Sequence, residues 1–327
     1  MANDQLLSLF DKVNGAYLSG EEISRQLGVS RTAVWKQIRK LEAQGYKFEA
    51  SRRLGYKLLD IPDQLSLTEL ASSLMTKSFG QTIKLYDTID STQNKAQQLA
   101  EQGAAEGTLV LAEQQLSGRG RMGREWISPS GKGIWMSMVL RPIVPIHYAP
   151  QLTLMTAVAL CRTLKRHISK EITIKWPNDL LIDGKKISGI LLESAAEDER
   201  LRYVTAGIGI SVNLEAADYP PQLLDKVTSL RIAEGRKLDR MSIITDFLLE
   251  WEQLYTLHQD QGFSVIAALW EALSSTLNTP ARLITPQGTI EGIPIGLAAS
   301  GALIVEQANG HRAEVFSAEM GEPLPSS

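Results

Sequence analysis

The sequence has little cysteine and histidine and no long apolar run. Its single cysteine, Cys161, excludes a disulfide framework, and its four histidines are too scattered to suggest a metal site. Cys161 falls in the apolar run 152–164, where a buried thiol is expected rather than a nucleophile. No stretch is long enough to span a bilayer, and the first residues lack the apolar centre of a signal peptide. We therefore expect a cytoplasmic protein with no membrane partner.

Net charge is also small. A formal charge of −3 over 327 residues excludes nucleic-acid binding by the chain as a whole, so any such site must be local. The length exceeds that of one ordinary core and predicts two or three domains. We place their boundaries at 1–62, 66–275 and 276–327, with a linker candidate at Ile61-Pro62-Asp63-Gln64, where the pattern breaks.

Residues 4–60 have the pattern of a winged helix-turn-helix. Ser19 precedes a helix over 21–27, and Gly28 ends it. Ser30 then caps a second helix, predicted over 31–44, with an apolar stripe on one side. Two strand-like runs, 46–50 and 55–59, flank a short turn, as in the wing of such a domain.

Positive charge is concentrated on the second helix and the wing. From 31 to 57 the sequence has eight lysines and arginines against two acids. The predicted DNA contacts come from the helix start and the wing tip, and they are Ser30, Arg31, Thr32, Lys36, Arg52 and Arg53. A helical docking domain with a solvated basic face is the alternative.

The remaining chain alternates between apolar strands and amphipathic helices, and then changes character. Helices are predicted at 95–102, 152–168, 241–260 and 264–273, and strands at 81–87, 108–112, 133–140, 172–176, 180–183, 189–194 and 202–210. Residues 214–235 are expected to be a loop region. In the last part of the chain, short strand-like runs separated by glycine turns predict a small β-barrel of the SH3 kind, with strands at 281–285, 289–294, 296–299, 302–306 and 313–317.

A basic, glycine-rich loop follows the strand at 108–112, with the sequence Gly118-Arg119-Gly120-Arg121-Met122-Gly123-Arg124-Glu125-Trp126. Glycine lets backbone N–H groups approach a phosphate, arginine supplies paired donors, and the indole offers a flat face for a purine. Taken alone, the loop is also compatible with a basic surface that contacts nucleic acid.

A second motif, Lys175-Trp176-Pro177-Asn178-Asp179, leads into a hairpin. The Asp183-Gly184 pair between apolar runs is a strong turn signal. The hairpin brings Lys186 back beside Asn178 and Asp179. Glycines at 207 and 209 permit a close approach of the backbone to a ligand, although glycines in a strand more often mark a bulge.

The two motifs, GRGRxGRxW and KWPND…KxxGIL, occur here in the order and spacing of bacterial biotin protein ligases. With the basic N-terminal segment, the chain resembles the bifunctional ligase and biotin-operon repressor. The resemblance covers nearly the whole chain and is weakest over the last fifty residues. It implies an α+β protein: a winged helix-turn-helix, a central mixed-sheet α/β catalytic domain of the biotin/lipoate ligase kind, and a C-terminal SH3-like β-barrel.

The resemblance also implies a two-step reaction. Biotin and ATP, with Mg²⁺, form biotinyl-adenylate and pyrophosphate, and a lysine of the biotin carboxyl carrier protein of acetyl-CoA carboxylase then takes the biotinyl group. The loop is expected to be disordered when empty and ordered over ligand. The implied partners are this carrier protein, operator DNA of biotin genes, and a second copy of the chain that binds when adenylate is present.

Site residues follow from the resemblance, position by position. The biotin-binding residues are Ser91, Thr92, Gln93, Gln115, Gly118, Arg119, Gly120, Arg121 and Lys186. ATP or adenylate is expected at Arg119, Arg121, Arg124, Trp126, Asn178 and Lys186, catalysis from Lys186, Arg119 and Arg121, and Mg²⁺ near Asp179 or Asn178. Gln93 and Ser211 stand where the family often has asparagine. Without the resemblance, Ser91 and Thr92 would be read as helix caps.

Three alternatives remain open. A lipoate or octanoate transferase would share the fold, but the arginine loop and the Trp-Pro-Asn-Asp segment are typical of the biotin branch. A non-enzymatic sensor would tolerate loss of Arg119, Arg121 or Lys186, and all three are present. A ligase without DNA binding is opposed by the basic helix and wing.

Overall fold

The computed structural model describes residues 2–13, 15–43, 46–51, 53–60, 63–197 and 200–321. The chain divides into two compact units, Met1–Gln64 and Leu65–Ser327, and each is described by itself. The linker candidates Ile61 and Pro62, and the wing residue Arg52, lie outside the described residues.

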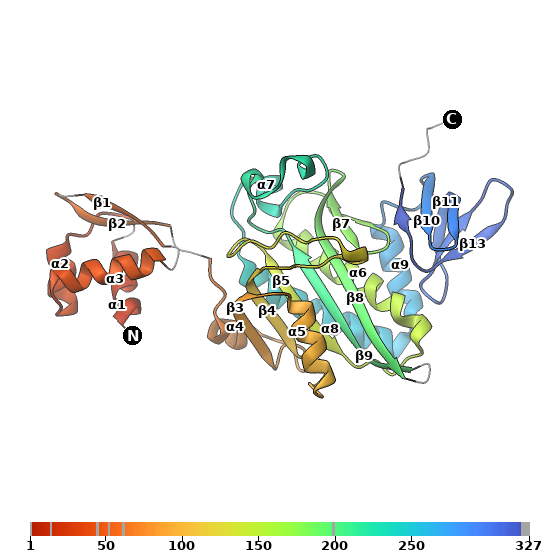
Figure 1. Ribbon diagram of the computed structural model, residues 1–327, viewed down its shortest axis with the longest axis horizontal. Helices are drawn as coiled ribbons and strands as arrows, with labels where there is room; N and C mark the ends of the chain where they lie inside the picture. The colour runs from red at the N-terminus through yellow and green to blue at the C-terminus, as the bar shows by residue number, and fades with distance from the viewer. Residues whose placement is uncertain are drawn as a thin grey trace. The chain divides into compact units, whose positions relative to one another are not determined.

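The first unit is the expected winged helix-turn-helix (Figure 1). Its helices are α1 (Ala2–Lys12), α2 (Gly20–Leu27) and α3 (Arg31–Ala43), and β1 (Lys47–Ser51) pairs antiparallel with β2 (Gly55–Asp60). The Ser19 hydroxyl accepts the N–H of Glu22 at the start of α2, and Gly28 ends the helix with a φ of 66°. The unit has its own small hydrophobic core, which includes Leu6, Ile23, Val34, Ile38 and Leu41.

A seven-stranded mixed sheet forms the centre of the second unit (Figure 1). The strand order is β3-β4-β5-β9-β8-β7-β6, and only the β3–β4 pair is parallel. The strands are β3 (Ile83–Ile89), β4 (Leu109–Gln115), β5 (Ile134–Leu140), β6 (Thr173–Lys175), β7 (Asp179–Ile182), β8 (Lys185–Glu197) and β9 (Arg200–Ile210).

Helices cover both faces of this sheet. The helices of the second unit are α4 (Leu67–Ser73), α5 (Thr92–Glu101), α6 (Ala149–His167), α7 (Leu230–Glu234), α8 (Arg240–Gln261) and α9 (Phe263–Leu273). Val110 and Val139 pack against α5, whereas their neighbours Leu109 and Leu140 belong to the larger core on the other face. The central strand β5 is buried along its whole length, which explains its nearly continuous apolar sequence.

Cys161 lies fully buried in α6, as predicted. Burial raises the pKa of its thiol to about 11, so the thiolate needed for nucleophilic chemistry is scarce at neutral pH.

The C-terminal part is a five-stranded antiparallel sheet in the order β13-β12-β11-β10-β14. Its strands are β10 (Ala281–Thr285), β11 (Gly288–Leu297), β12 (Leu303–Glu306), β13 (Arg312–Val315) and β14 (Glu319–Met320). The two strands expected at 289–294 and 296–299 are one strand, because the register shift between Pro294 and Gly296 bends β11 without ending it. The short β14 was not predicted. Leu283, Leu303 and Val315 join the core of the central sheet.

The loop prediction for 214–235 was wrong in part. The segment contains two 3₁₀ turns, Ala216–Asp218 and Pro221–Leu223, followed by α7. Ser229 caps α7 and Gly235 ends it, but a helix of five residues is too short to show an apolar period. The predicted strand at 189–194 was also too short, because β8 begins at the hairpin turn.

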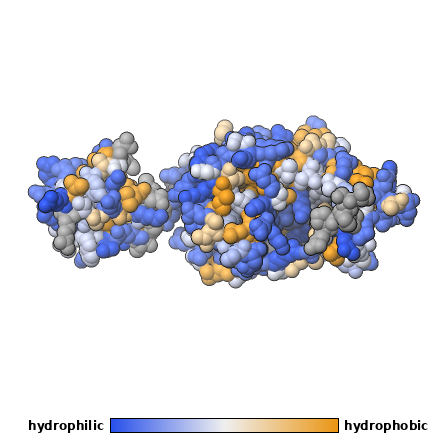
Figure 2. Space-filling model, turned by 90° about the horizontal axis from the view of Figure 1, so that it is seen from above, coloured by the Kyte–Doolittle hydropathy of each residue, from blue (hydrophilic) through white to orange (hydrophobic). Residues whose placement is uncertain are grey.

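Polar side chains cover most of the face of the protein shown in Figure 2, and apolar side chains occur there in small separate groups. Among the described residues, no helix combines the length and apolar character needed to cross a membrane.

Candidate active site

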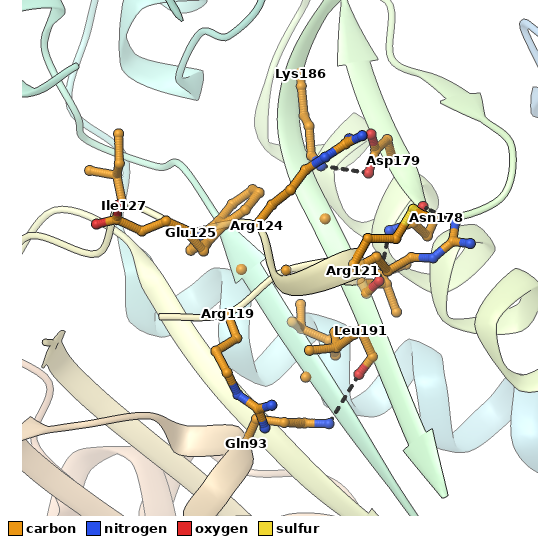
Figure 3. Close-up of a pocket in the computed structure, with 18 of the residues that line it drawn as sticks. Gln93, Arg119, Arg121, Arg124, Glu125, Ile127, Asn178, Asp179, Lys186 and Leu191 are labelled. Atoms are coloured by element: carbon orange, nitrogen blue, oxygen red, sulfur yellow. Dashed lines mark hydrogen bonds and ion pairs between the residues drawn. The ribbon is translucent and has the colours of Figure 1, made fainter. Parts of the chain in front are cut away.

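A cavity of about 280 Å³ opens where the glycine-rich loop meets the sheet (Figure 3). Its walls come from the start of α5, the end of β4, strands β5, β8 and β9, the Lys175–Asp179 segment, and residues 211–227. Elements far apart in the sequence therefore bring most of the predicted site residues into one pocket.

Glycines on β8 and β9 make room for this pocket. A Cβ at Gly209 would lie 2.4 Å from the indole nitrogen of Trp126, and one at Gly207 would lie 2.6 Å from Oε1 of Gln93. The register between β8 and β9 is regular at both positions and shifts only near Ala195. These glycines are therefore sites of close approach and not bulges.

One end of the pocket is lined by buried polar groups at the start of α5. The Ser91 hydroxyl accepts the N–H of Gln93, so Ser91 does cap the helix. Thr92 donates through its N–H and its hydroxyl to Oε1 of Gln115, at 2.9 and 3.1 Å. The same hydroxyl lies 2.9 Å from the Oγ of Ser137 on β5. This chain of contacts fixes the polar groups before any ligand binds.

Gln93 is held so that one of its atoms lacks a partner. Its Nε2 donates to the carbonyl and the hydroxyl of Thr205, at 3.1 and 3.0 Å, and lies 3.3 Å from the carbonyl of Leu191. Its Oε1 is buried and accepts no hydrogen bond from the described part of the chain. A buried acceptor without a donor is costly, and Gln93 is one of the residues that line the pocket.

The glycine-rich loop is a narrow hairpin. The Trp126 N–H donates to the Gly118 carbonyl at 2.8 Å, and the Gly120 N–H donates to the Arg124 carbonyl at 2.7 Å. The tip turns at Met122 and Gly123, which have φ values of 57° and 73°. A Cβ at Gly118 would lie 2.4 Å from the Trp126 carbonyl oxygen, so only glycine fits there.

The three arginines of the loop point to three different elements. Arg119 pairs with Glu193 of β8. Arg121 donates to Oδ1 of Asn178 at 3.0 Å and to the hydroxyl of Ser317 at 2.7 Å, and burial lowers the pKa of its guanidinium. Arg124 pairs with Glu319 of β14.

Lys186 lies at the end of the pocket opposite Arg119 and Gln93 (Figure 3). Its Nζ is 2.7 Å from Oδ1 of Asp179 and 5.1 Å from the centre of the Trp126 ring. The predicted hairpin is present, with φ values of 49° at Asp183 and 75° at Gly184. The structure therefore brings together Lys186, Asp179 and Trp126, and in this conformation it keeps Arg119 apart from them.

Several pocket residues were not predicted from the sequence. Tyr219, Leu223 and Val227 come from the region expected to be a loop, and Ala318 and Met320 come from the C-terminal part of the chain. They carry no local motif.

Ser137 was missed as well, although a serine within the apolar run of β5 is a signal that could have been noticed.

Tyr219 lines the pocket and bonds to the segment beside Lys186. Its ring is buried, and its hydroxyl donates to the Thr228 carbonyl at 3.1 Å. Burial raises the pKa of this phenol to about 12. The Lys186 backbone N–H donates to the Lys226 carbonyl, and its carbonyl accepts from the Thr228 N–H, both at 2.9 Å. The segment around Val227 is thus fixed beside the lysine.

The residues that the structure describes contain no group of three or more His, Cys, Asp or Glu side chains that could hold a metal ion. Asp179 is a single carboxylate already paired with Lys186. Mg²⁺ prefers oxygen ligands and usually keeps several waters, so one carboxylate beside substrate phosphates suits it.

The predicted DNA contacts lie in the first unit. Arg31, Thr32 and Lys36 are exposed on α3, and Arg53 is exposed in the turn of the wing. The Ser30 hydroxyl instead accepts the Ala33 N–H at 3.2 Å, as a helix cap. Arg31 also pairs with Glu21 of α2.

Comparison with known families agrees with this architecture. Residues 4–57 match the profile described as HTH domain, residues 85–211 that of the Biotin/lipoate A/B protein ligase family, and residues 276–320 that of the Biotin protein ligase C terminal domain. The fold and the site thus define a class: a ligase of the biotin kind that carries its own DNA-binding unit.

Curated relatives narrow this class. The chain is 44% identical over 315 residues to the bifunctional ligase/repressor BirA of Bacillus spizizenii, covering 96% of this chain and 97% of that protein. It is 29% identical to the Escherichia coli bifunctional ligase/repressor BirA, covering 90% of this chain and 89% of that protein. The chain belongs to the family of bifunctional biotin ligase/repressors.

Among solved structures, a biotin protein ligase from Aquifex aeolicus in complex with biotin and ATP superimposes with a TM-score of 0.64 at 28% identity. The match covers 74% of this chain and 98% of that one. The predicted fold, the ligase activity and the repressor function are confirmed by these comparisons. They argue against the lipoate transferase, the non-enzymatic sensor and the ligase without DNA binding.

Proposed function

We propose that the pocket holds biotin with its ring at Gln93 and its carboxylate at Lys186, and that biotinyl-adenylate forms at the Lys186 end. One observation carries this assignment: a buried acceptor that has no donor among the described residues lies at one end, and a lysine ammonium lies at the other. Biotin has N–H donors on its ring and an anionic carboxylate on its tail, in matching positions.

The polar end suits the ureido ring. Oε1 of Gln93 accepts one ring N–H and thereby gains the partner that it lacks. The hydroxyl of Thr92 and the amide of Gln115 present further polar groups beside it, with Ser91 as the cap that fixes them. The apolar tail then lies along Trp126 and the glycine strands. Gly118 and Gly120 give the loop the shape that covers it.

The Lys186 end suits the reacting groups. Attack of the biotin carboxylate oxygen on the α-phosphorus brings two anions together, and fixed positive charge lowers this barrier. Lys186 supplies such charge, and Arg121 is already oriented by Asn178 and Ser317. Arg124 lies nearby on the loop (Figure 3).

Adenine is accommodated at the same end. Trp126 offers an aromatic face, and Leu223 and Val227 offer apolar surface. Bound Mg²⁺ would neutralise phosphate charge, with Asp179 or Asn178 holding its waters.

The chemistry needs no covalent enzyme intermediate. In the first step a bond forms between the biotin carboxylate and the α-phosphorus, and pyrophosphate leaves. In the second, the neutral amine of an acceptor lysine attacks the acyl carbon, AMP leaves, and the amine proton passes to solvent or phosphate. We assign the acceptor lysine to the biotin carboxyl carrier protein of acetyl-CoA carboxylase, and we place both reactions in the cytoplasm.

Self-association would connect the pocket to DNA. Beyond Gly189, β8 pairs with β9 on one side, and none of the described strands pairs with its other side. This open edge suits pairing with a second copy, and a dimer carries two α3 helices for a palindromic operator of biotin genes. Ordering of the loop by adenylate would favour this dimer. An association constant that ultracentrifugation finds unchanged by biotin and ATP would contradict the coupling.

Transfer of labelled biotin to a carrier domain tests the ligase assignment. Wild type should require MgATP, and Lys186→Ala should lose at least about 100-fold in rate through the lost electrostatic stabilisation. Lys84→Ala, at an exposed position on β3, is the control and should transfer normally. A folded wild type that binds biotin but transfers none would be a sensor and would disprove the assignment.

A further inference from the structure

Glu193 is a charged residue of the sheet to which the reaction above gives no role. Its carboxylate lies on β8 and receives the guanidinium of Arg119, at 3.5 Å for Nη1–Oε1 and 3.2 Å for Nη2–Oε2. Gln97 of α5 donates its Nε2 to the same carboxylate at 3.0 Å. Three separate elements, the glycine-rich loop, β8 and α5, therefore meet at one carboxylate.

The position of Arg119 shows what the contact with Glu193 can do. Figure 3 shows its side chain at the same end of the pocket as Gln93, which is the end assigned to the biotin ring. The loop is fixed to β3 at its base, where the N–H groups of Leu116 and Ser117 donate to the carbonyls of Ile89 and Asp90, both at 2.9 Å. The Arg119–Glu193 pair extends this attachment across the pocket to β8.

We propose that Glu193 is a positioning residue that holds Arg119 across the pocket and so retains the acyl-adenylate until the acceptor lysine arrives. Glu193 itself touches no reacting atom, since it acts through Arg119. The inference rests on the proposed placement of biotin.

Retention matters because the mixed anhydride reacts with water and with any amine it meets. An enzyme limits this loss by keeping its loop closed. Removing one attachment of the loop raises the open fraction, but it leaves Lys186 and Arg121 in place. Formation of the adenylate should therefore continue while its escape accelerates.

The strength of the attachment follows from its exposure. The side chains of Arg119 and Glu193 are 38% and 30% exposed, so solvent and salt screen the pair. The effect should be moderate and should weaken as ionic strength rises.

The test uses the full chain and two substitutions, Glu193→Gln, which keeps the size of the side chain, and Glu193→Ala, which removes both contacts. Preformed labelled biotinyl-adenylate complex is isolated by rapid gel filtration, and its release is followed over time. Serum albumin in the solution traps released adenylate as biotinylated lysine. Glu197→Gln, at an exposed position at the end of the same strand, is the matched control.

Release from both Glu193 variants should be about fivefold faster than from wild type at low salt, which is the upper end for an exposed pair. Albumin labelling should rise in parallel, while the kcat of pyrophosphate exchange at saturating biotin stays unchanged. Added NaCl should accelerate release from wild type and from Glu197→Gln, and it should have little effect on the Glu193 variants.

Two results would overturn the proposal: release from the Glu193 variants at the wild-type rate with wild-type salt dependence, or a fall in exchange kcat without faster release. Failure of the pocket assignment looks different, because Lys186→Ala would then form adenylate normally whatever the Glu193 variants do.

Discussion

Lys186 and Asp179 form an ion pair across the hairpin of β7 and β8, with 2.7 Å between Nζ and Oδ1. The pair is partly exposed to the pocket, so an incoming carboxylate or phosphate competes with Asp179 for the ammonium. The same carboxylate is the candidate for holding Mg²⁺. Asp179 could therefore serve to pair with Lys186 or to hold the metal ion, and the two roles predict different results.

Asp179→Asn separates them. If Asp179 helps to hold the waters of Mg²⁺, the Mg²⁺ concentration for half-maximal pyrophosphate exchange should rise about tenfold, because a negative charge near the ion is lost. Asp183→Asn is the control, since asparagine suits the turn position with a φ of 49°. An unchanged Mg²⁺ curve would assign Asp179 to Lys186 alone.

A methyl group on the pocket floor should block biotin. In Gly209→Ala the new Cβ would meet the Trp126 indole, so the ring must move into the space for the biotin tail. Affinity for biotin, measured by calorimetry, should fall about tenfold or more, in line with the usual cost of overpacking. Gly321→Ala, whose Cβ would have ordinary 3.4 Å contacts, should bind normally. Normal binding by Gly209→Ala would place biotin elsewhere.

The parts of the fold that could be predicted are those with local signals. Ser19 and Gly28 mark the two ends of α2, and Asp183-Gly184 marks a turn in which both residues have positive φ. These signals act within a few residues, so the sequence alone reveals them.

The parts that could not be predicted depend on distant contacts. Residues 226–228 are fixed by backbone hydrogen bonds to Lys186, some forty positions earlier, and no local pattern encodes that pairing. The direction of Arg119 was likewise hidden, because its partner Glu193 lies on another strand. Residue types identified the loop as a site for anions, but only the tertiary contacts show that its arginines diverge.

The C-terminal sheet should influence use of ATP through Arg124 and Glu319. Both side chains are substantially exposed, so Glu319→Gln should raise the KM for ATP only about threefold, with the KM for biotin unchanged. The exchanged pair Arg124→Glu with Glu319→Arg should recover much of the loss if the contact itself matters. Additive effects in this double-mutant cycle would show that the two residues act separately.

Stability should depend on pH through Tyr219. Its pKa is raised from 10.0 to about 12 in the folded protein, so the folded state holds the phenol proton more tightly than the unfolded state. Its contribution is complete below pH 10 and is lost as pH rises toward 12, and it amounts to about 3 kcal/mol at most.

In Tyr219→Phe, the urea concentration at the midpoint of unfolding should fall less steeply between pH 10 and pH 12 than it does in the wild type. Tyr86→Phe, a partly exposed tyrosine of β3, provides the comparison. An unchanged pH profile in Tyr219→Phe would contradict the effect of burial.

Lys36 should contribute to the salt dependence of DNA binding. This side chain is exposed on α3, and the helix carries the basic face of the first unit. Each phosphate contact by a lysine releases condensed counterions, so Lys36→Ala should lower the slope of log K against log salt by about one. Binding to a selected operator duplex and to random duplex should weaken alike, because a phosphate contact carries no sequence information. Lys12→Ala is the control, because it also removes one positive charge from the first unit, but from an exposed position on α1 and not on α3 or the wing. If both variants reduced the slope equally, net charge and not the α3 surface would govern binding.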